Sequence, residues 1–296
     1  MTIGIGTSGK KAGEAVFRAL QAVERVTTGS IGGFAVYAVI KDDGKVQKYT
    51  TQRGGTKTLI THGETTGVLP PEDILQAKIA AIISSGPDRP EPLEKVIPSK
   101  DNIGLVTGHR IPMATCRVTG KPLNSRVLEL MESGLDAIEA VNKVMDDNSN
   151  ADAGLIAVDI KGNVGIRNSS RVSKRPDVAM SFKENKESGA KVAVLMNEIH
   201  PEKSAAELAA ETAIMIMSEA RKPDIEILVK TGLKVEAGNE DLIYVNKNNE
   251  ATRIVTTDEW ALKGEAICVT PYLLSKVLKE GKEIGYTIEE PLTILK

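Results

Sequence analysis

The sequence predicts an α+β protein in which helices pack outside a mostly antiparallel sheet. Short strand patterns occur in pairs that are joined by tight turns. Such pairs must be antiparallel, because parallel strands need a crossover of about a dozen residues or more. Each pair also follows a segment with helical periodicity, so a helix–hairpin unit repeats along the chain. Helices that alternate with antiparallel hairpins are typical of layered α+β folds.

The first helix–hairpin unit begins near the N-terminus. Apolar residues in Ala12–Val26 have the spacing of an amphipathic helix. An unbroken apolar run, Phe34–Ile40, is followed by the turn Lys41–Gly44 and the half-polar stretch Lys45–Thr50. This order predicts a β-hairpin whose first strand is buried.

The second unit repeats this order in the middle of the chain. Helices are expected at Ser125–Glu132 and Asp136–Met145, separated at Gly134, a natural C-terminal cap. The hairpin that follows has an apolar strand at Ala153–Val158 and a return strand at Val164–Arg167. The pattern therefore predicts the same local fold twice.

The third unit is weaker. The capping box Ser204–Glu207 predicts a helix that reaches about Glu219, and a hairpin is expected at Asp241–Val245 and Ala251–Val255. Because similar units occur throughout the chain, a single domain over residues 1–296 is favoured. The alternative is two lobes that are split near the Pro-rich loop at residues 85–98.

The remaining segments are assigned from their composition and from the Gly and Pro residues that bound them. Further strands are expected at Thr2–Ile5, Gly104–Thr107, Lys191–Met196, Ile225–Val229 and Ala266–Val269, and further helices at Pro71–Ser84 and Tyr272–Glu280.

Composition excludes several classes of function. The chain has 296 residues, a formal net charge of −2 and 3% aromatic residues, which gives no basis for nucleic-acid binding. No apolar run approaches the roughly 20 residues that span a bilayer, and no signal-peptide pattern is expected at the N-terminus. Two cysteines fit a reducing compartment, so we expect a cytoplasmic protein that does not contact membranes.

The segment Gly4–Gly9 matches the spacing G-x-G-x-x-G of dinucleotide-binding loops. The next strand opens a hairpin rather than completing a βαβ unit, which argues against that function. The favoured interpretation is that these glycines let the first strand pass close beside a helix. Nucleotide binding at the loop stays as a third hypothesis.

Arginines follow both strong hairpins at the same distance from the turn, Arg53 and Arg171. Small polar residues, Thr51 and Ser169, precede them, and Gly54 would let a ligand approach the backbone. A guanidinium beside hydroxyl groups can bind a carboxylate through two parallel hydrogen bonds. The alternative is a pair of surface arginines that are solvated or salt-bridged.

The second unit also resembles a known superfamily. Its helix Ser133–Val141, its strand Asp152–Asp159 and the turn that ends in Gly162-Asn163-Val164 are similar to those of N-terminal-nucleophile (Ntn) hydrolases. The likeness is to the isoaspartyl-peptidase, asparaginase and γ-glutamyltransferase branch. In the first unit, the strand end Thr50–Gly55 is similar to the Thr/Ser/Gly-rich strand end of that branch.

The resemblance implies a four-layer αββα sandwich and amide hydrolysis by a Thr, Ser or Cys freed as a chain N-terminus. The matching strand of the second unit begins with Ala153 or Gly154, which cannot be a nucleophile. Thr2 could take that role after removal of Met1, with Lys10 or Arg53 lowering the pKa of its amine. Ser30 after Gly29, freed by self-cleavage, or no nucleophile at all, are the alternatives.

Histidine and cysteine give no strong site. His109 and Cys116 could form a Cys/His pair, although a buried structural cysteine is the favoured interpretation. His62, His109 and His200 are widely spaced and have no partner at metal-ligand spacing. We therefore expect neither a metal nor a cofactor.

The leading hypothesis is an amidohydrolase that resembles Ntn hydrolases and acts on a small amide carrying a carboxylate. Thr2 would be the nucleophile, and Arg53 and Arg171, with Thr51, Gly54 and Ser169, would hold the substrate. The alternative is a non-catalytic relative, an oligomeric small-anion-binding or scaffold protein of the same fold. The expected partner is a small-molecule anion or amide, and homo-oligomerisation is left open.

Overall fold

The computed structural model describes residues 1–111, 114–218, 224–230, 232–258 and 274–288, and the backbone of 268–269 and 293–294. The chain divides into two compact units, Met1–Glu219 and Ala220–Lys296. A single domain, or a division near residues 85–98, is what the sequence predicts. That loop lies inside the first unit, where Gln52 and Arg53 hold it through contacts with Arg89 and Asp88.

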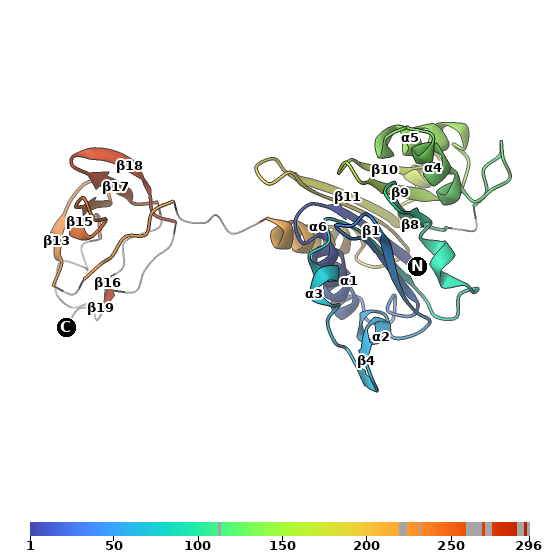
Figure 1. Ribbon diagram of the computed structural model, residues 1–296, viewed down its shortest axis with the longest axis horizontal. Helices are drawn as coiled ribbons and strands as arrows, with labels where there is room; N and C mark the ends of the chain where they lie inside the picture. Colours follow the sequence, from blue (N-terminus) through green and yellow to red (C-terminus); the bar gives the residue numbers. More distant parts are fainter. Residues whose placement is uncertain are drawn as a thin grey trace. The chain divides into compact units, whose positions relative to one another are not determined.

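Two antiparallel sheets form the centre of the first unit, and helices cover their outer faces (Figure 1). The large sheet contains, in spatial order, β11 (Val178–Asn185), β12 (Ala190–Asn197), β1 (Thr2–Ser8), β6 (Ile79–Ser85), β2 (Ala35–Ile40) and β3 (Val46–Thr51). The small sheet contains β10 (Val164–Asn168), β9 (Gly154–Asp159), β8 (Gly104–His109) and β7 (Ser99–Lys100). The fold is α+β, as predicted.

The helices lie on opposite sides of this pair of sheets. The large sheet is covered by α1 (Ala12–Val26) and α6 (Glu202–Met217), and the small sheet by α4 (Leu123–Glu132) and α5 (Ala137–Asp147). The short elements are α2 (Thr56–Leu59), α3 (Glu72–Leu75), β4 (Thr61–His62), β5 (Thr65–Thr66) and the 3-10 helices η1 (Leu93–Val96) and η2 (Val172–Lys174). The resulting order of layers is αββα.

The predicted hairpins are present, because their signals are local. β2 pairs with β3 and β9 pairs with β10, both antiparallel, and α1 has the predicted bounds. The predicted capping box is absent. Helix α6 begins at Glu202, and Glu207 instead accepts a hydrogen bond from Ser181.

The predicted helix Pro71–Ser84 is wrong. Only α3 is helical there, and the following residues form β6, which is buried along its whole length between β1 and β2. An apolar run that is buried on both faces has no alternation, so its periodicity cannot distinguish strand from helix. Strand β11, whose apolar face is exposed, was not predicted.

The second unit has its own small sheet and core. The sheet order is β13 (Lys234–Ala237), β15 (Ala251–Thr256), β14 (Leu242–Val245), β17 (Lys276–Lys279) and β18 (Lys282–Tyr286). A separate backbone pair joins β16 (Cys268–Val269) and β19 (Thr293–Ile294). The predicted β14–β15 hairpin is present. The strand expected at Ile225–Val229 is reduced to a bridge between Leu228 and Glu250, and Lys276–Lys279 is a strand rather than part of the helix expected at Tyr272–Glu280.

Strand β1 makes the closest contact between the two sheets. Ile3 and Ile5 face the helices, whereas Gly4 and Gly6 face the small sheet. A Cβ at Gly4 would lie 2.5 Å from the carbonyl oxygen of Gly108, and one at Gly6 would lie 2.6 Å from Ile156. Gly4 and Gly6 therefore serve sheet-on-sheet contact rather than the expected contact with a helix. A Cβ at Gly9, by contrast, would lie 3.4 Å from Met217 Sδ of α6.

The loop after β1 uses its backbone donors internally. The Gly9 amide donates to Lys78 O, and the Gly13 amide donates to Ala77 O. These amides are therefore not arranged to hold a phosphate. No helix among the described residues has the length and apolar character that crossing a bilayer requires.

The contact at Gly4 predicts a large effect of one methyl group. Gly4→Ala should lower the free energy of unfolding by about 2 kcal/mol or more, because backbone atoms of Gly108 cannot move away cheaply. Gly86→Ala is the matched control, since its Cβ would meet nothing nearer than 3.6 Å, and its effect should stay within about 0.5 kcal/mol. Equal stability of the two variants in urea denaturation would contradict the close contact.

Candidate functional site

Six strand ends meet at one edge of the sandwich. In the large sheet, Thr2 lies opposite both Ser85 and Asn197. In the small sheet, the corresponding row contains His109, Gly154 and Asn168. The contact between Gly4 and Gly108 brings the two rows together. We call Thr2, Ser85, His109, Asn168 and Asn197 the interlayer cluster.

The side chains of this cluster point into the space between the sheets. Successive residues of a strand alternate between its faces. Asn197 follows Leu195 on the face that contributes to the inter-sheet core, and Ser85 follows Ile83 in the same way. Polar groups thus replace the apolar core at this end of the sandwich.

Thr2 is hydrogen-bonded to its nearest neighbours. Its Oγ1 donates to Met1 O at 2.8 Å and lies 3.4 Å from Ser85 Oγ. Ser85 Oγ also donates to Met1 O and accepts from Arg89 Nη2 at 2.7 Å. The Arg89 guanidinium lies 5.8 Å from the centre of the Phe34 ring, and no carboxylate pairs with it among the described residues. The guanidinium of Arg89 is therefore connected to Thr2 by hydrogen bonds through the hydroxyl group of Ser85.

A network of charges borders the interlayer cluster. The Met1 α-amine lies 2.8 Å from Glu198 Oε2, and Arg110 Nη2 lies 2.8 Å from Glu198 Oε1. Arg110 and Arg175 also share Asp152, each at 3.3 Å. Hydrogen bonds from the α-amine and from Arg175 hold the pKa of Glu198 below its usual value.

Arg175 joins this network to Asp177. Its Nε and Nη2 donate to the two carboxylate oxygens of Asp177, and this pairing lowers the pKa of Asp177. Arg110 and Glu198 both have a left-handed backbone, with φ of 56° and 57°. The two residues at these neighbouring strand ends thus share a backbone conformation that is uncommon outside glycine.

His109 is fully buried and uncharged at neutral pH. Burial lowers its pKa from 6.5 to about 4. Its Nε2 lies 2.8 Å from Asn168 Oδ1. Because an amide oxygen only accepts hydrogen bonds, the orientation of the Asn168 amide places the imidazole proton on Nε2. The pair occupies the space of a side chain at Gly154, where a Cβ would lie 2.1 Å from Asn168 Oδ1. That contact explains why glycine stands at this strand start.

Three buried polar atoms of the described residues have no hydrogen-bond partner: His109 Nδ1, Arg110 Nε and Asn197 Oδ1. All three belong to the end of β8 or β12 that borders Thr2. They offer two acceptors and one donor, and buried groups of this kind are normally satisfied. These unpaired groups mark the strand ends beside Thr2 as a candidate polar site.

The first set of predicted substrate-binding residues has other partners. Arg53 is exposed and pairs with Asp88 at 2.5 Å. Thr51 Oγ1 donates to Arg53 O at 2.8 Å and lies 2.9 Å from Thr58 Oγ1, while Gly54 supplies a turn with φ of 94°. These residues shape the turn after β3.

The second set is likewise structural or separate. Ser169 is buried, donates to Ala151 O and accepts from the Val172 amide at 3.1 Å, which begins η2. Arg171 is exposed. Arg171 follows strand β10 of the small sheet, and β10 lies over β12 of the large sheet. Arg53 follows β3. Four strand spacings, about 19 Å, separate β12 from β3 within the large sheet. Arg53 and Arg171 therefore do not converge on one carboxylate.

The other candidate nucleophiles lie elsewhere. Ser30 is in the turn after α1, where its amide donates to Thr27 O. Cys116 is buried beside Asn148 rather than beside His109. Burial acts to raise the pKa of the Cys116 thiol, but hydrogen bonds from Thr119, Val118 and Asn148 outweigh it and the pKa lies below its usual value. Within the described ranges, no group of three or more His, Cys, Asp or Glu could hold a metal ion.

The sequence analysis missed most of the interlayer cluster. Ser85, Arg110, Asn168, Asn197 and Glu198 were not assigned to a site. The usable signal was a polar residue that directly ends a buried apolar strand, as Asn197 ends β12.

Comparison with known families agrees with the division into two units. Residues 2–226 match the Domain of unknown function (DUF6963), which is more than half of the chain. The chain belongs to this family. Residues 232–296 match a second family, the Domain of unknown function (DUF7259). None of the curated proteins matches the chain.

The buried imidazole predicts a specific pH dependence. Between pH 6.5 and 4 the unfolded chain binds a proton at His109 that the folded chain does not, so stability decreases as the pH falls through this window. The loss should reach about 3 kcal/mol at pH 4, and His109→Gln should remove this part of the dependence. The control is His62→Gln, at an exposed histidine, which should keep the wild-type profile. Identical urea-unfolding profiles of wild type and His109→Gln would contradict the assignment.

Proposed function

We propose that the first unit is an Ntn-hydrolase-like amidohydrolase in which Thr2 becomes the nucleophile once Met1 is removed. The position of Thr2 carries this proposal. Thr2 begins a central strand of an αββα sandwich and faces the interlayer cluster, within hydrogen-bond reach of Ser85. A nucleophile needs such neighbours to orient it and to hold the reacting group.

The chemistry follows from a free N-terminal threonine. Its α-amine takes the Oγ1 proton as the oxygen attacks the amide carbon, and that proton then passes to the departing amine. The C–N bond breaks and an ester on Thr2 remains. Water attacks the ester, releases the acid and returns the proton to Oγ1. No other reactant is required.

The substrate class follows from the cation that is connected to Thr2 through Ser85. We place the carboxylate of a small amide substrate on Arg89, which reaches Ser85 at 2.7 Å and has no carboxylate partner among the described residues. Arg89 takes the role that the sequence analysis gave to Arg53 and Arg171.

A non-catalytic anion-binding protein is the second candidate. One observation favours it: with Met1 in place, its α-amine is paired with Glu198, and its carbonyl oxygen accepts hydrogen bonds from Thr2 and Ser85. In a chain that retains Met1, the N-terminus is therefore well defined, but the amine of Thr2 is part of a peptide bond. Such a chain would lack the general base.

Labelling of the purified full-length chain distinguishes the two candidates. The amidohydrolase should lack Met1 by intact mass and should form a single ester adduct with a β-lactone at Thr2. Thr2→Ala is the matched control, because alanine still allows removal of Met1, and it should form no adduct and lose at least about 10³-fold in amide hydrolysis. Thr2→Ser should keep the adduct. Retained Met1, or equal labelling of Thr2→Ala, would exclude the proposed nucleophile.

The substrate assignment predicts an effect at Arg89. With a panel of aspartyl and glutamyl amides, Arg89→Ala should lower kcat/KM by about 10- to 100-fold, because the substrate carboxylate loses a charged partner. Arg53→Ala, which removes an exposed arginine already paired with Asp88, is the control and should leave kcat/KM unchanged. The reverse order of these two effects would restore the original assignment to Arg53.

A further inference from the structure

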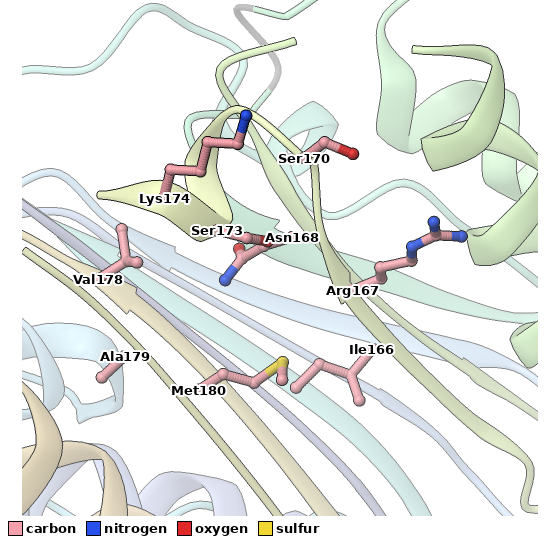
Figure 2. Close-up of a pocket in the computed structure, with 9 residues that line it drawn as sticks. All are labelled: Ile166, Arg167, Asn168, Ser170, Ser173, Lys174, Val178, Ala179 and Met180. Carbon is pink, nitrogen blue, oxygen red and sulfur yellow. The ribbon is translucent and has the colours of Figure 1, made fainter. Parts of the chain in front are cut away.

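An open pocket lies at the edge of the sandwich between β10 and β11. The large sheet extends one strand beyond β12, and β10, the last strand of the small sheet, lies over β12. The edges of the two sheets therefore do not coincide, and a pocket of about 590 Å³ remains between them. Figure 2 shows its lining residues: Ile166, Arg167, Asn168, Ser170, Ser173, Lys174, Val178, Ala179 and Met180.

One side of the pocket is apolar and uncovered. Alternate residues of β11 point towards α6, where Ser181 donates to Glu207. The opposite face presents Met180 and Phe182, which are 56% and 44% exposed. Ile166 of β10 lies across from Met180 in the same pocket (Figure 2). Neighbouring large apolar side chains exposed on one strand face are typical of a binding surface.

The other side of the pocket is cationic. Lys174 is exposed at the rim, and no described carboxylate forms an ion pair with it. Arg167, by contrast, pairs with Asp146 at 2.6 Å. The described lining residues include no Asp or Glu, and the hydroxyl of Ser170 lies on the same side as Lys174 (Figure 2). The rim thus has an uncompensated positive charge beside an apolar floor.

We propose that this pocket binds an amphipathic anion, an unbranched acyl chain that ends in a carboxylate. The chain would lie on Ile166, Val178 and Met180, and the carboxylate would pair with Lys174. The volume is within the range of small-molecule sites, and apolar floors with a few polar groups are typical of them. The charge of the rim selects an anion over a neutral or cationic chain.

The pocket also touches the interlayer cluster. Asn168 lines the pocket and holds His109 Nε2 at 2.8 Å. Val178, at the same end, lies opposite Asn197, and Asn197 lies opposite Thr2. A ligand in the pocket should therefore shift the imidazole signals of His109 in NMR spectra, which gives a local readout of binding. Binding itself does not require Thr2, so this inference stands apart from the proposed hydrolysis.

Calorimetric titration of the full-length protein with decanoate tests the proposal. Saturable binding with one site is expected, whereas decyltrimethylammonium, with the same tail and the opposite charge, and acetate, with the same head and no tail, should bind at least 10-fold more weakly. Lys174→Glu and Met180→Glu should each weaken decanoate binding at least 10-fold. Lys174→Gln, a milder change at the same exposed site, should weaken it in the same direction.

Two controls keep the result specific. Lys186→Glu reverses an exposed charge in the turn after β11, outside the pocket, and should bind like wild type. Thr2→Ala should also bind like wild type, which separates this site from the proposed nucleophile. Equal binding of the cationic and anionic chains, or no loss in Lys174→Glu, would overturn the proposal. A concentration-dependent dimer that Met180→Glu dissociates would assign the pocket to a second copy of the chain instead.

Discussion

The close approach of β1 to the small sheet is the constraint on which the rest of the first unit depends. Gly4 and Gly6 present no side chains to the small sheet, so the backbone of β1 can lie directly against Gly108 and against the side chain of Ile156. This contact aligns the ends of strands from both sheets in one row. The site is thus a product of sheet spacing, and its polar residues occupy positions that would otherwise belong to the apolar core.

The parts of the fold that the sequence predicted are those with local causes. Helix α1 and the hairpins β2–β3 and β9–β10 follow from periodicity and turn residues within each segment. Strand β6 could not be recognised in this way, because its burial on both faces is set by β1, β2 and the layers around them. The boundary at Glu219 was missed for a related reason, since similar hairpins in both units looked like one repeat.

The site was harder to predict than the fold. Its residues end strands that are far apart in the sequence, and only the sheet order places Thr2 beside Ser85 and Asn197. Arg53 carries a guanidinium that could bind a substrate carboxylate, but a nearby loop supplies Asp88 as its partner. Thr2 was proposed from its place in the chain, and its role stays a prediction. The structure adds the neighbours that make this position chemically distinctive.

The ion pair between the Met1 α-amine and Glu198 has a practical consequence. Any residues fused ahead of Met1 replace the charged amine with a neutral amide. Among the described residues, Glu198 then keeps Arg110 and Arg175 as charged partners. Purification tags on this protein therefore belong at the C-terminus, and material made with an N-terminal tag reports on an altered site.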